Sequence, residues 1–187
     1  MNKKKFIQKQ LILEVFFDWR TELIFVTVGT HEQQFDRLIK KIDELNLLNV
    51  IKEDVIIQRG YCSYKPTSCF YRDFFSYQEM KDNIEKARII VTHGGPASFL
   101  SALQIGKVPI VVPRQLCFGE HINNHQLEFS RLVFKRFNNI LLVEDVGKLG
   151  VFIENYDEIV RTLNSSLNSN NRNFCENLKR IVDSLIL

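Results

Sequence analysis

The sequence predicts an α/β protein with a Rossmann-like parallel sheet that carries helices on both faces. Short runs rich in Val, Ile and other apolar residues alternate along the chain with segments of helical periodicity. The strand-like runs are apolar almost throughout, which is typical of parallel strands buried on both sides. With 187 residues, of which 45% are hydrophobic, the chain is long enough for one domain with a substantial core.

Six strands are expected, and each is a short apolar run bounded by polar residues, glycine or proline. Their expected ranges are 23–28, 55–58, 68–71, 88–92, 108–112 and 140–143. Helical segments separate them. In the first of these, apolar side chains recur at the spacing of one helix face, at Phe35, Leu38, Ile39, Ile42 and Leu45.

The later helices are marked by their first residues. Ser76, followed three positions later by Glu79, is a capping box and predicts a helix that runs to about residue 87. Pro96 suits the first turn of the next helix, where its missing N–H is not needed. Further helices are expected at 122–135, 157–163 and 174–186, with a loop rich in Asn and Ser at 164–173.

The N-terminal 22 residues differ in character from the rest. Lys3, Lys4 and Lys5 precede an apolar patch at 11–17 that Glu14 interrupts, and no small-residue cleavage site follows. We expect residues 1–22 to form an amphipathic helical extension that lies on a membrane surface or on a partner. The alternative is a helix that packs on its own domain. Residues 23–187 are expected to form the single folded domain.

Charge and composition narrow the classes of protein. The net charge of +3 is small and the acidic and basic residues are interspersed, so nucleic acid is not an expected partner. No apolar run approaches the roughly 18 residues that a membrane-spanning helix needs. The cysteines are too widely spaced for a zinc motif and indicate free thiols in a reducing cytoplasm; they are Cys62, Cys69, Cys117 and Cys175.

The most informative segment is a glycine-rich turn. The apolar run at 89–92 ends in His93, Gly94 and Gly95, and a helix-like segment follows. Two glycines between a strand and a helix let backbone N–H groups come close to a ligand, and the helix N-terminus favours an anion such as phosphate. Ser98 adds a hydroxyl to that first turn.

A polar loop follows the next strand, after Pro113. It contains Arg114, Glu120, His121, Asn124, His125 and Gln126. Open α/β sheets bind ligands at the carboxyl ends of their strands, so we expect this loop and the glycine-rich turn to border one site. Carboxylate, imidazole and carboxamide groups supply directed hydrogen-bond donors and acceptors for a polar ligand.

Four motifs, in this order and at this spacing, are specific for a known family. They are FVTVGTHEQQF at 25–35, THGGPAS at 92–98, GKVPIVVPRQ at 106–115 and FGEHINNHQ at 118–126. Through them, residues 23–187 resemble the C-terminal, donor-binding half of a GT-B glycosyltransferase of family 28. The chain resembles the donor-binding subunit of two-chain bacterial capsule and exopolysaccharide glycosyltransferases. The resemblance implies a nucleotide-sugar-binding domain.

The resemblance also implies roles for individual residues. The pyrophosphate of a UDP-sugar would meet the glycine-rich turn, main chain near Phe75 would read the uracil, and the polar loop would face the sugar. The expected donor-binding residues are Gly29, Thr30, Phe75, His93, Gly94, Gly95, Ser98, Arg114, Glu120, His121, Asn124 and Gln126. One departure is Ser101, which stands where relatives often carry a Glu that holds the ribose hydroxyls.

The chemistry implied by the resemblance is inverting transfer, in which a hydroxyl of a lipid-linked saccharide attacks the anomeric carbon as UDP leaves. Helix N–H groups at 95–98 would stabilise the charge on the leaving phosphate. We therefore expect no metal and no cofactor besides the UDP-sugar donor, and the sequence has no D-x-D triplet. The general base would be His31, Glu120 or a residue of another chain.

A single domain of this kind cannot form an interdomain cleft with itself. The expected partner is a membrane-anchored subunit with the acceptor-binding domain, which would hold this cytoplasmic protein at the inner face of the membrane. The predicted function is the catalytic, donor-binding subunit of a transferase that adds a hexose to a lipid-linked saccharide in capsule or exopolysaccharide synthesis. The alternative is a non-catalytic activating or scaffold subunit of a glycosyltransferase complex.

The same residues allow other interpretations. His93, Gly94 and Gly95 also resemble the oxyanion-hole motif of lipases and esterases, but that chemistry needs a G-x-S-x-G elbow, which the sequence lacks. His121 and His125, four residues apart, could ligate a metal on a helix face, although no third ligand is evident.

Overall fold

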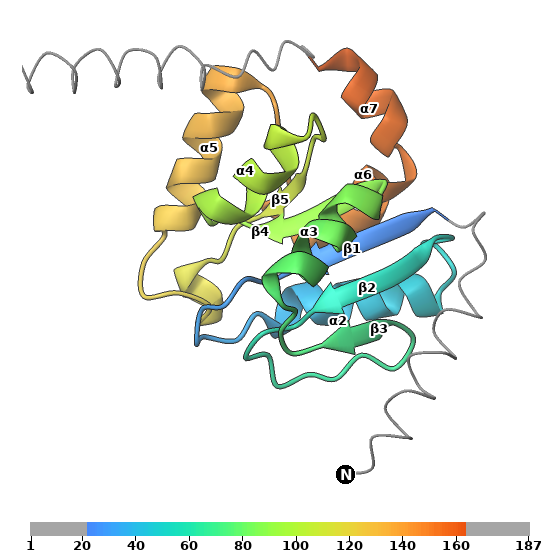
Figure 1. The fold of residues 1–187 in the computed structure, drawn as a ribbon. Coiled ribbons are helices and arrows are strands. Elements are labelled where there is room, and N and C mark those ends of the chain that lie inside the picture. Colours follow the sequence, from blue (N-terminus) through green and yellow to red (C-terminus); the bar gives the residue numbers. More distant parts are fainter. Residues whose placement is uncertain (1–21, 164–187) are drawn as a thin grey trace, which may run out of the picture.

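The computed structural model describes residues 22–163, and these form a six-stranded parallel sheet in the order β3-β2-β1-β4-β5-β6. The sheet twists through the centre of the molecule in Figure 1. Every neighbouring pair is parallel, so the predicted Rossmann-like fold class is confirmed. The strands are β1 (Leu23–Thr27), β2 (Asp54–Gln58), β3 (Phe70–Arg72), β4 (Ile89–His93), β5 (Ile110–Val112) and β6 (Leu141–Leu142).

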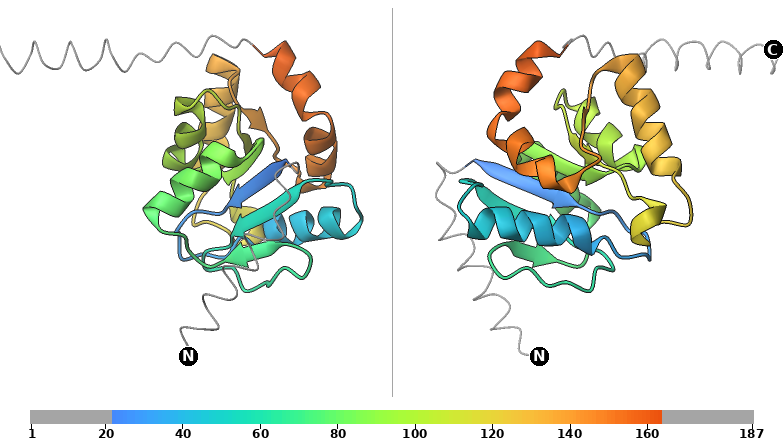
Figure 2. Two further views of the ribbon diagram at one scale, coloured as in Figure 1. Left: turned by 45° about the vertical axis from the view of Figure 1, so that its right-hand side comes forward. Right: turned by 180° about the vertical axis from the view of Figure 1, so that it is seen from behind.

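Helices cover both faces of the sheet, as Figure 2 shows from two sides. They are α2 (Asp36–Leu47), α3 (Tyr77–Lys86), α4 (Pro96–Gln104), α5 (His125–Phe137), α6 (Leu149–Glu154) and α7 (Tyr156–Thr162), with 3-10 turns η1 (Leu116–Phe118) and η2 (Val146–Lys148). Alternate strand residues serve opposite faces. Ile24 and Val26 of β1 pack with α2, α6 and α7, whereas Phe25 packs with α3 and α4. This two-sided burial explains why the strands are apolar throughout.

The local signals in the sequence set most of the element boundaries. The capping box is present, since Ser76 Oγ accepts from Glu79 N and the Glu79 carboxylate accepts from Ser76 N. All six expected strands are present with small shifts at their ends. The expected helix at 174–186 and the extension at 1–21 lie outside the described residues. Among residues 22–163, no helix is long and apolar enough to cross a membrane.

Two elements differ from the expectation. Helix α5 begins at His125 rather than at residue 122, because asparagine side chains hold the preceding segment in turns: Asn124 Oδ1 accepts from Leu116 N at 3.0 Å, and Asn123 Oδ1 accepts from His125 N at 3.1 Å. Helix α6 was not predicted. It has only six residues, and glycines at 147 and 150 obscure its periodicity.

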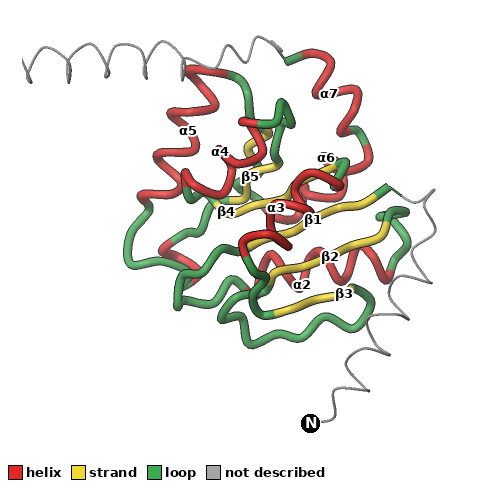
Figure 3. The backbone as a smooth tube through the Cα atoms, viewed as in Figure 1, coloured by secondary structure: helices red, strands yellow, loops and turns green. Residues whose placement is uncertain are grey.

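The topology positions the functional site. After β3 the chain crosses back to place β4 beside β1, so strand order reverses direction between β1 and β4. In open α/β sheets, ligands bind at such a switch point, outside the carboxyl ends of the strands. Figure 3 shows the loops, in green, that gather at this edge. They are the segments after β1, β4 and β5.

Candidate functional site

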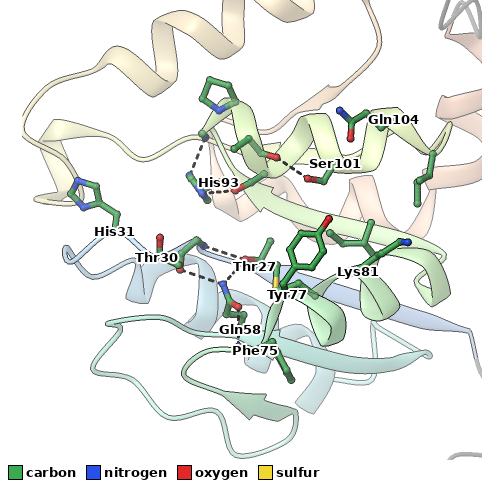
Figure 4. A pocket seen from close by; sticks show the side chains of 18 of the residues that line it. Thr27, Thr30, His31, Gln58, Phe75, Tyr77, Lys81, His93, Ser101 and Gln104 are labelled. Atoms are coloured by element: carbon green, nitrogen blue, oxygen red, sulfur yellow. Dashed lines mark hydrogen bonds between the residues drawn. The ribbon is translucent and has the colours of Figure 1, made fainter. Parts of the chain in front are cut away.

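A pocket of about 910 Å³ opens at the switch point, between β1, β4, α3 and α4. Figure 4 shows His31 at one end of this pocket and Lys81 and Gln104 at the other. Eight of the residues predicted from the sequence line it: Gly29, Thr30, His31, Phe75, His93, Gly95, Ser98 and Gln126. Five others do not: Gly94, Arg114, Glu120, His121 and Asn124. The structure thus brings the glycine-rich turn and the loop after β1 to one cavity.

The N-terminus of α4 forms one wall of the pocket. Gly95 is the N-cap residue and Pro96 occupies the first helical position. The N-cap glycine offers no side chain to the first turn, and the Gly95 N–H itself donates to His93. The helix dipole creates a positive potential next to the hydroxyl of Ser98, which favours a bound anion.

His93 lies beneath this turn and is almost completely buried, with 9% of its surface exposed. Its Nδ1 atom accepts a hydrogen bond from Gly95 N at 3.0 Å, and its Nε2 atom lies 2.8 Å from Ser98 Oγ. Burial, reinforced by the positive charge of Arg114, lowers the pKa of His93 to about 4. The imidazole is therefore neutral at neutral pH.

Gly29 and Gly95 lie against the His93 ring, and neither position has room for a side chain. A Cβ atom on Gly29 would lie 2.4 Å from His93 Nε2, and one on Gly95 would lie 2.2 Å from His93 Cε1. Gly29 also has a φ of +74°, a left-handed conformation that side chains other than glycine rarely adopt. The two glycines form a slot that holds the imidazole ring.

Gln58, at the end of β2, is a pocket residue that the sequence analysis missed. Its side chain is buried and joins three segments: Nε2 donates to Thr27 Oγ1 at 3.1 Å and to the Gly29 carbonyl at 3.4 Å, while Oε1 accepts from Phe75 N at 3.2 Å. The available signal was a polar residue at the carboxyl end of an otherwise apolar strand. In this structure the Phe75 N–H is donated to Gln58.

Arg114 supports the loops around the pocket from the interior of the protein. It is fully buried, and its guanidinium donates to the carbonyl oxygens of Val28, Gln33, Gln34 and Glu120 at 2.8–3.3 Å. It also lies 4.9 Å from the centre of the Phe35 ring. Arg114 therefore fastens the loop after β1 to the loop after β5.

Glu120 is also fully buried. Both of its carboxylate oxygens accept from Arg37, each at 2.9 Å, and Oε2 accepts from Gln115 N at 3.1 Å. Arg114 donates to the backbone carbonyl oxygen of Glu120 and not to its carboxylate. Glu120 instead pairs with a residue of α2, and its carboxylate does not line the pocket.

The histidines of the two loops lie side by side. The rings of His31 and His121 are 5.1 Å apart between centroids, and His31 Nδ1 accepts from Gln33 N at 3.2 Å. Partial burial and then the charge of Arg114 lower the pKa of His31. His125 stacks on Phe129 of α5. Within residues 22–163, no three His, Cys, Asp or Glu side chains are grouped to hold a metal ion.

The far end of the pocket lies between α3 and α4. Tyr77, Lys81 and Glu85 come from α3, and Ser101 and Gln104 come from α4. Ser101 Oγ donates to the Ala97 carbonyl within its own helix at 2.9 Å. Apolar side chains, including Phe75, Met80 and Ile84, form the wall between these ends. The pocket therefore has a polar end beside the start of α4 and an apolar wall suited to a ring.

Solved structures place the fold among GT-B glycosyltransferases. The glycotransferase of kitacinnamycin superposes with a TM-score of 0.54 at 16% identity, covering 74% of this chain and 36% of that chain. The glycosyltransferase SnogD from Streptomyces nogalater gives a TM-score of 0.53 at 17% identity, covering 77% and 37%. At this identity the likeness shows the fold alone, that of the C-terminal half of a GT-B enzyme.

Sequence comparison establishes the family. Residues 23–177 match the glycosyltransferase family 28 C-terminal domain, and the chain belongs to this family. It is 33% identical over 121 residues to the human UDP-N-acetylglucosamine transferase subunit ALG13, which covers 60% of this chain and 10% of the human protein. It is 30% identical over 151 residues to the Yarrowia lipolytica (strain CLIB 122 / E 150) subunit of the same name, covering 75% of this chain and 72% of that protein.

These relatives correct the function predicted from the sequence. The prediction of a catalytic subunit that adds a hexose in capsule or exopolysaccharide synthesis is wrong, because the relatives are subunits of a UDP-N-acetylglucosamine transferase in animals and yeast. They favour the alternative interpretation, a subunit of a glycosyltransferase complex. The chain spans only about a tenth of the length of the human and mouse relatives.

Proposed function

We propose that this chain is a subunit of a UDP-N-acetylglucosamine transferase complex, that its pocket holds the UDP part of the donor, and that it has no transferase activity without a second chain. The observation that carries the proposal is the pocket beside the N-terminus of α4, with Ser98 on its wall. The names of the human and yeast relatives support N-acetylglucosamine as the sugar.

The two ends of the pocket fit the two parts of a nucleotide. The N-terminus of α4 and the hydroxyl of Ser98 would receive the phosphates. The apolar wall at Phe75, Met80 and Ile84 would receive the base. The volume of about 910 Å³ is at the large end of the range for small-molecule sites, as a nucleotide sugar requires. In this proposal the positive end of α4 offsets the leaving-group charge, and no metal is needed.

The names of the relatives support a second chain, because each relative is called a transferase subunit. Of the two bases considered in this chain, His31 lines the pocket and Glu120 does not. The buried ion pair with Arg37 keeps the Glu120 carboxylate away from the cavity, so it is not positioned to take a proton from an acceptor. We propose that the acceptor site and the base belong to a membrane-anchored partner, and that the acceptor is a lipid-linked saccharide. This chain would then act at the cytoplasmic face of the membrane through its partner.

Calorimetric titration of the full chain with UDP tests the proposal. Saturable binding of UDP and of UDP-N-acetylglucosamine is expected, with the same affinity in the presence of EDTA. Ser98→Ala should weaken UDP binding about ten-fold or more, because it removes a hydrogen bond to a charged phosphate that contributes roughly 1.5–3 kcal/mol.

The matched control is Ser63→Ala, which removes a hydroxyl on the surface, bonded to Asp36 and outside the pocket. This variant should bind UDP as the wild type does. The absence of saturation by the folded wild type up to millimolar UDP would refute a nucleotide site in this chain. Equal losses in the two serine variants would refute the placement of the phosphates beside α4.

A further inference from the structure

The buried ring of His93 has a defined proton arrangement. Gly95 N lies 3.0 Å from His93 Nδ1, and because a backbone N–H can only donate, Nδ1 must present its lone pair. A neutral imidazole carries one N–H, which then resides on Nε2. That atom is 2.8 Å from Ser98 Oγ, so His93 donates to the serine hydroxyl.

A competing arrangement would place the proton on Nδ1, directed at Gln126 Oε1. That contact is longer, at 3.4 Å, and the same oxygen already accepts from Arg114 N at 3.3 Å. A proton on Nδ1 would also leave the Gly95 N–H facing another N–H at 3.0 Å. The glycine-rich turn therefore selects the Nε2–H tautomer.

The tautomer decides what Ser98 offers to a ligand. A hydroxyl has one proton and two acceptor lone pairs. When His93 donates to Ser98 Oγ, one lone pair is occupied and the hydroxyl proton remains free to point into the pocket. If His93 accepted instead, the Ser98 hydroxyl proton would point at His93. Only oxygen lone pairs would then face the pocket, and they would repel the phosphate oxygens.

We propose that His93 is a positioning residue that, as the Nε2–H tautomer, turns the Ser98 hydroxyl into a donor aimed at the phosphate of the bound nucleotide. This inference rests on the proposed function, because it assumes a phosphate beside α4. It also excludes a different use of the same groups. Ser98, His93 and Gln126 lie next to one another in the order of a hydrolase triad. Here, however, the histidine nitrogen next to the serine carries the proton, so His93 cannot act as the base for Ser98.

Two substitutions separate the two hydrogen bonds of the ring. His93→Asn places an amide near the position of Nδ1, where it can accept from Gly95 N, and has no atom near Nε2. His93→Gln reaches the position of Nε2 with an N–H donor. We expect His93→Asn to weaken UDP binding roughly ten-fold, as Ser98→Ala does, and His93→Gln to restore most of the affinity.

A double-mutant cycle tests whether His93 acts through Ser98. The variant with both His93→Asn and Ser98→Ala should bind UDP no more weakly than Ser98→Ala alone, since the serine proton is already absent. Losses that multiply would overturn the inference. Thermal unfolding of each variant, measured alongside, identifies any loss of affinity that comes from loss of the fold.

Nitrogen NMR of the ¹⁵N-histidine-labelled full chain provides a readout that does not depend on nucleotide binding. The His93 signals should show a protonated Nε2 and an unprotonated Nδ1 at neutral pH. A proton on Nδ1 overturns the inference even if UDP binds. Conversely, the Nε2–H tautomer in a chain that does not bind UDP would refute the proposed function and leave the tautomer assignment standing.

Discussion

Asp43 on α2 is expected to be a major determinant of stability outside the pocket. Its carboxylate is fully buried and accepts from the backbone N–H groups of Thr67 and Ser68 and from the hydroxyls of Tyr64, Thr67 and Ser68, at 2.6–3.1 Å. These contacts hold the loop before β3 against α2. Burial alone would raise the pKa of Asp43, but the hydrogen bonds from Ser68, Tyr64 and Thr67 outweigh it and keep the pKa well below its usual range.

The expected cost of Asp43→Asn follows from these donors. The hydroxyls can rotate and accept from the new NH₂ group, whereas the two backbone N–H groups can only donate to the remaining oxygen. Two charge-assisted hydrogen bonds therefore become neutral ones, at about 1–1.5 kcal/mol each, so the free energy of unfolding should fall by about 2–3 kcal/mol. Asp43→Ala leaves both N–H groups buried without a partner and should cost about 4–5 kcal/mol.

Urea denaturation of the full chain, followed by far-ultraviolet circular dichroism, measures the effect. The midpoint should fall in Asp43→Asn with little change in slope. The control is Asp82→Asn on the exposed side of α3, where the carboxylate accepts from Gln78. This control should stay within about 0.5 kcal/mol of the wild type.

The pH dependence gives an independent check. Because the folded-state pKa of Asp43 is lower than the unfolded value of about 3.9, the carboxylate contributes its full stabilisation above that value and loses it as the pH falls further. The difference between the wild type and Asp43→Asn should therefore be constant near neutral pH and shrink below about pH 4. Wild-type stability in Asp43→Asn, or a difference that persists unchanged in acid, would refute the reasoning.

Three further substitutions have defined outcomes. Gly95→Ala should abolish UDP binding in the calorimeter, because its Cβ would lie 2.2 Å from His93 Cε1; unchanged affinity would show that the slot is not needed. Lys107→Met should lower the unfolding free energy by about 1–2 kcal/mol in urea, because Lys107 Nζ donates to three carbonyls at the end of α3. Arg37→Met should cost about 3–5 kcal/mol by stranding the buried carboxylate of Glu120, and a second substitution, Glu120→Gln, should recover part of that loss.

The fold could be predicted because its signals are local. Uninterrupted apolar runs identify parallel strands within a window of five residues, and the capping box at Ser76 fixes the start of α3 without reference to the rest of the chain. Helix α6 was missed because its stability comes from packing rather than from its own pattern. Leu149 and Ile153 are buried against the core, but Gly147 and Gly150 weaken the helical signal.

The glycine-rich turn could be predicted for the same reason: His93, Gly95 and Ser98 lie within six residues and form one strand–turn–helix unit. The need for the glycines was only partly visible. The sequence indicated close approach of the backbone to a ligand, whereas the structure also assigns both Gly29 and Gly95 a steric role around a buried ring. That role depends on β1 and β4 being neighbours in the sheet.

Arg114 and Glu120 illustrate where sequence reasoning fails at a site built from loops. They lie in the polar loop that borders the switch point, but their partners come from segments some 80 residues earlier in the chain. Both side chains turn inward and hold the loops that carry the pocket residues. Local sequence cannot distinguish a polar side chain that contacts ligand from one that positions the loop, because only tertiary neighbours differ.

This distinction separates substitutions that lower affinity from those that also lower stability. The guanidinium of Arg114 satisfies carbonyls of both loops, so Arg114→Met would leave up to four buried oxygens without a donor. We expect a loss of at least about 3 kcal/mol in urea unfolding together with weaker UDP binding. Ser98→Ala should weaken UDP binding with a smaller loss of stability, about 1–2 kcal/mol, because it leaves only the Nε2–H group of His93 without its partner. Weaker binding in Arg114→Met at wild-type stability would instead indicate that Arg114 contacts the nucleotide directly, which its buried position argues against.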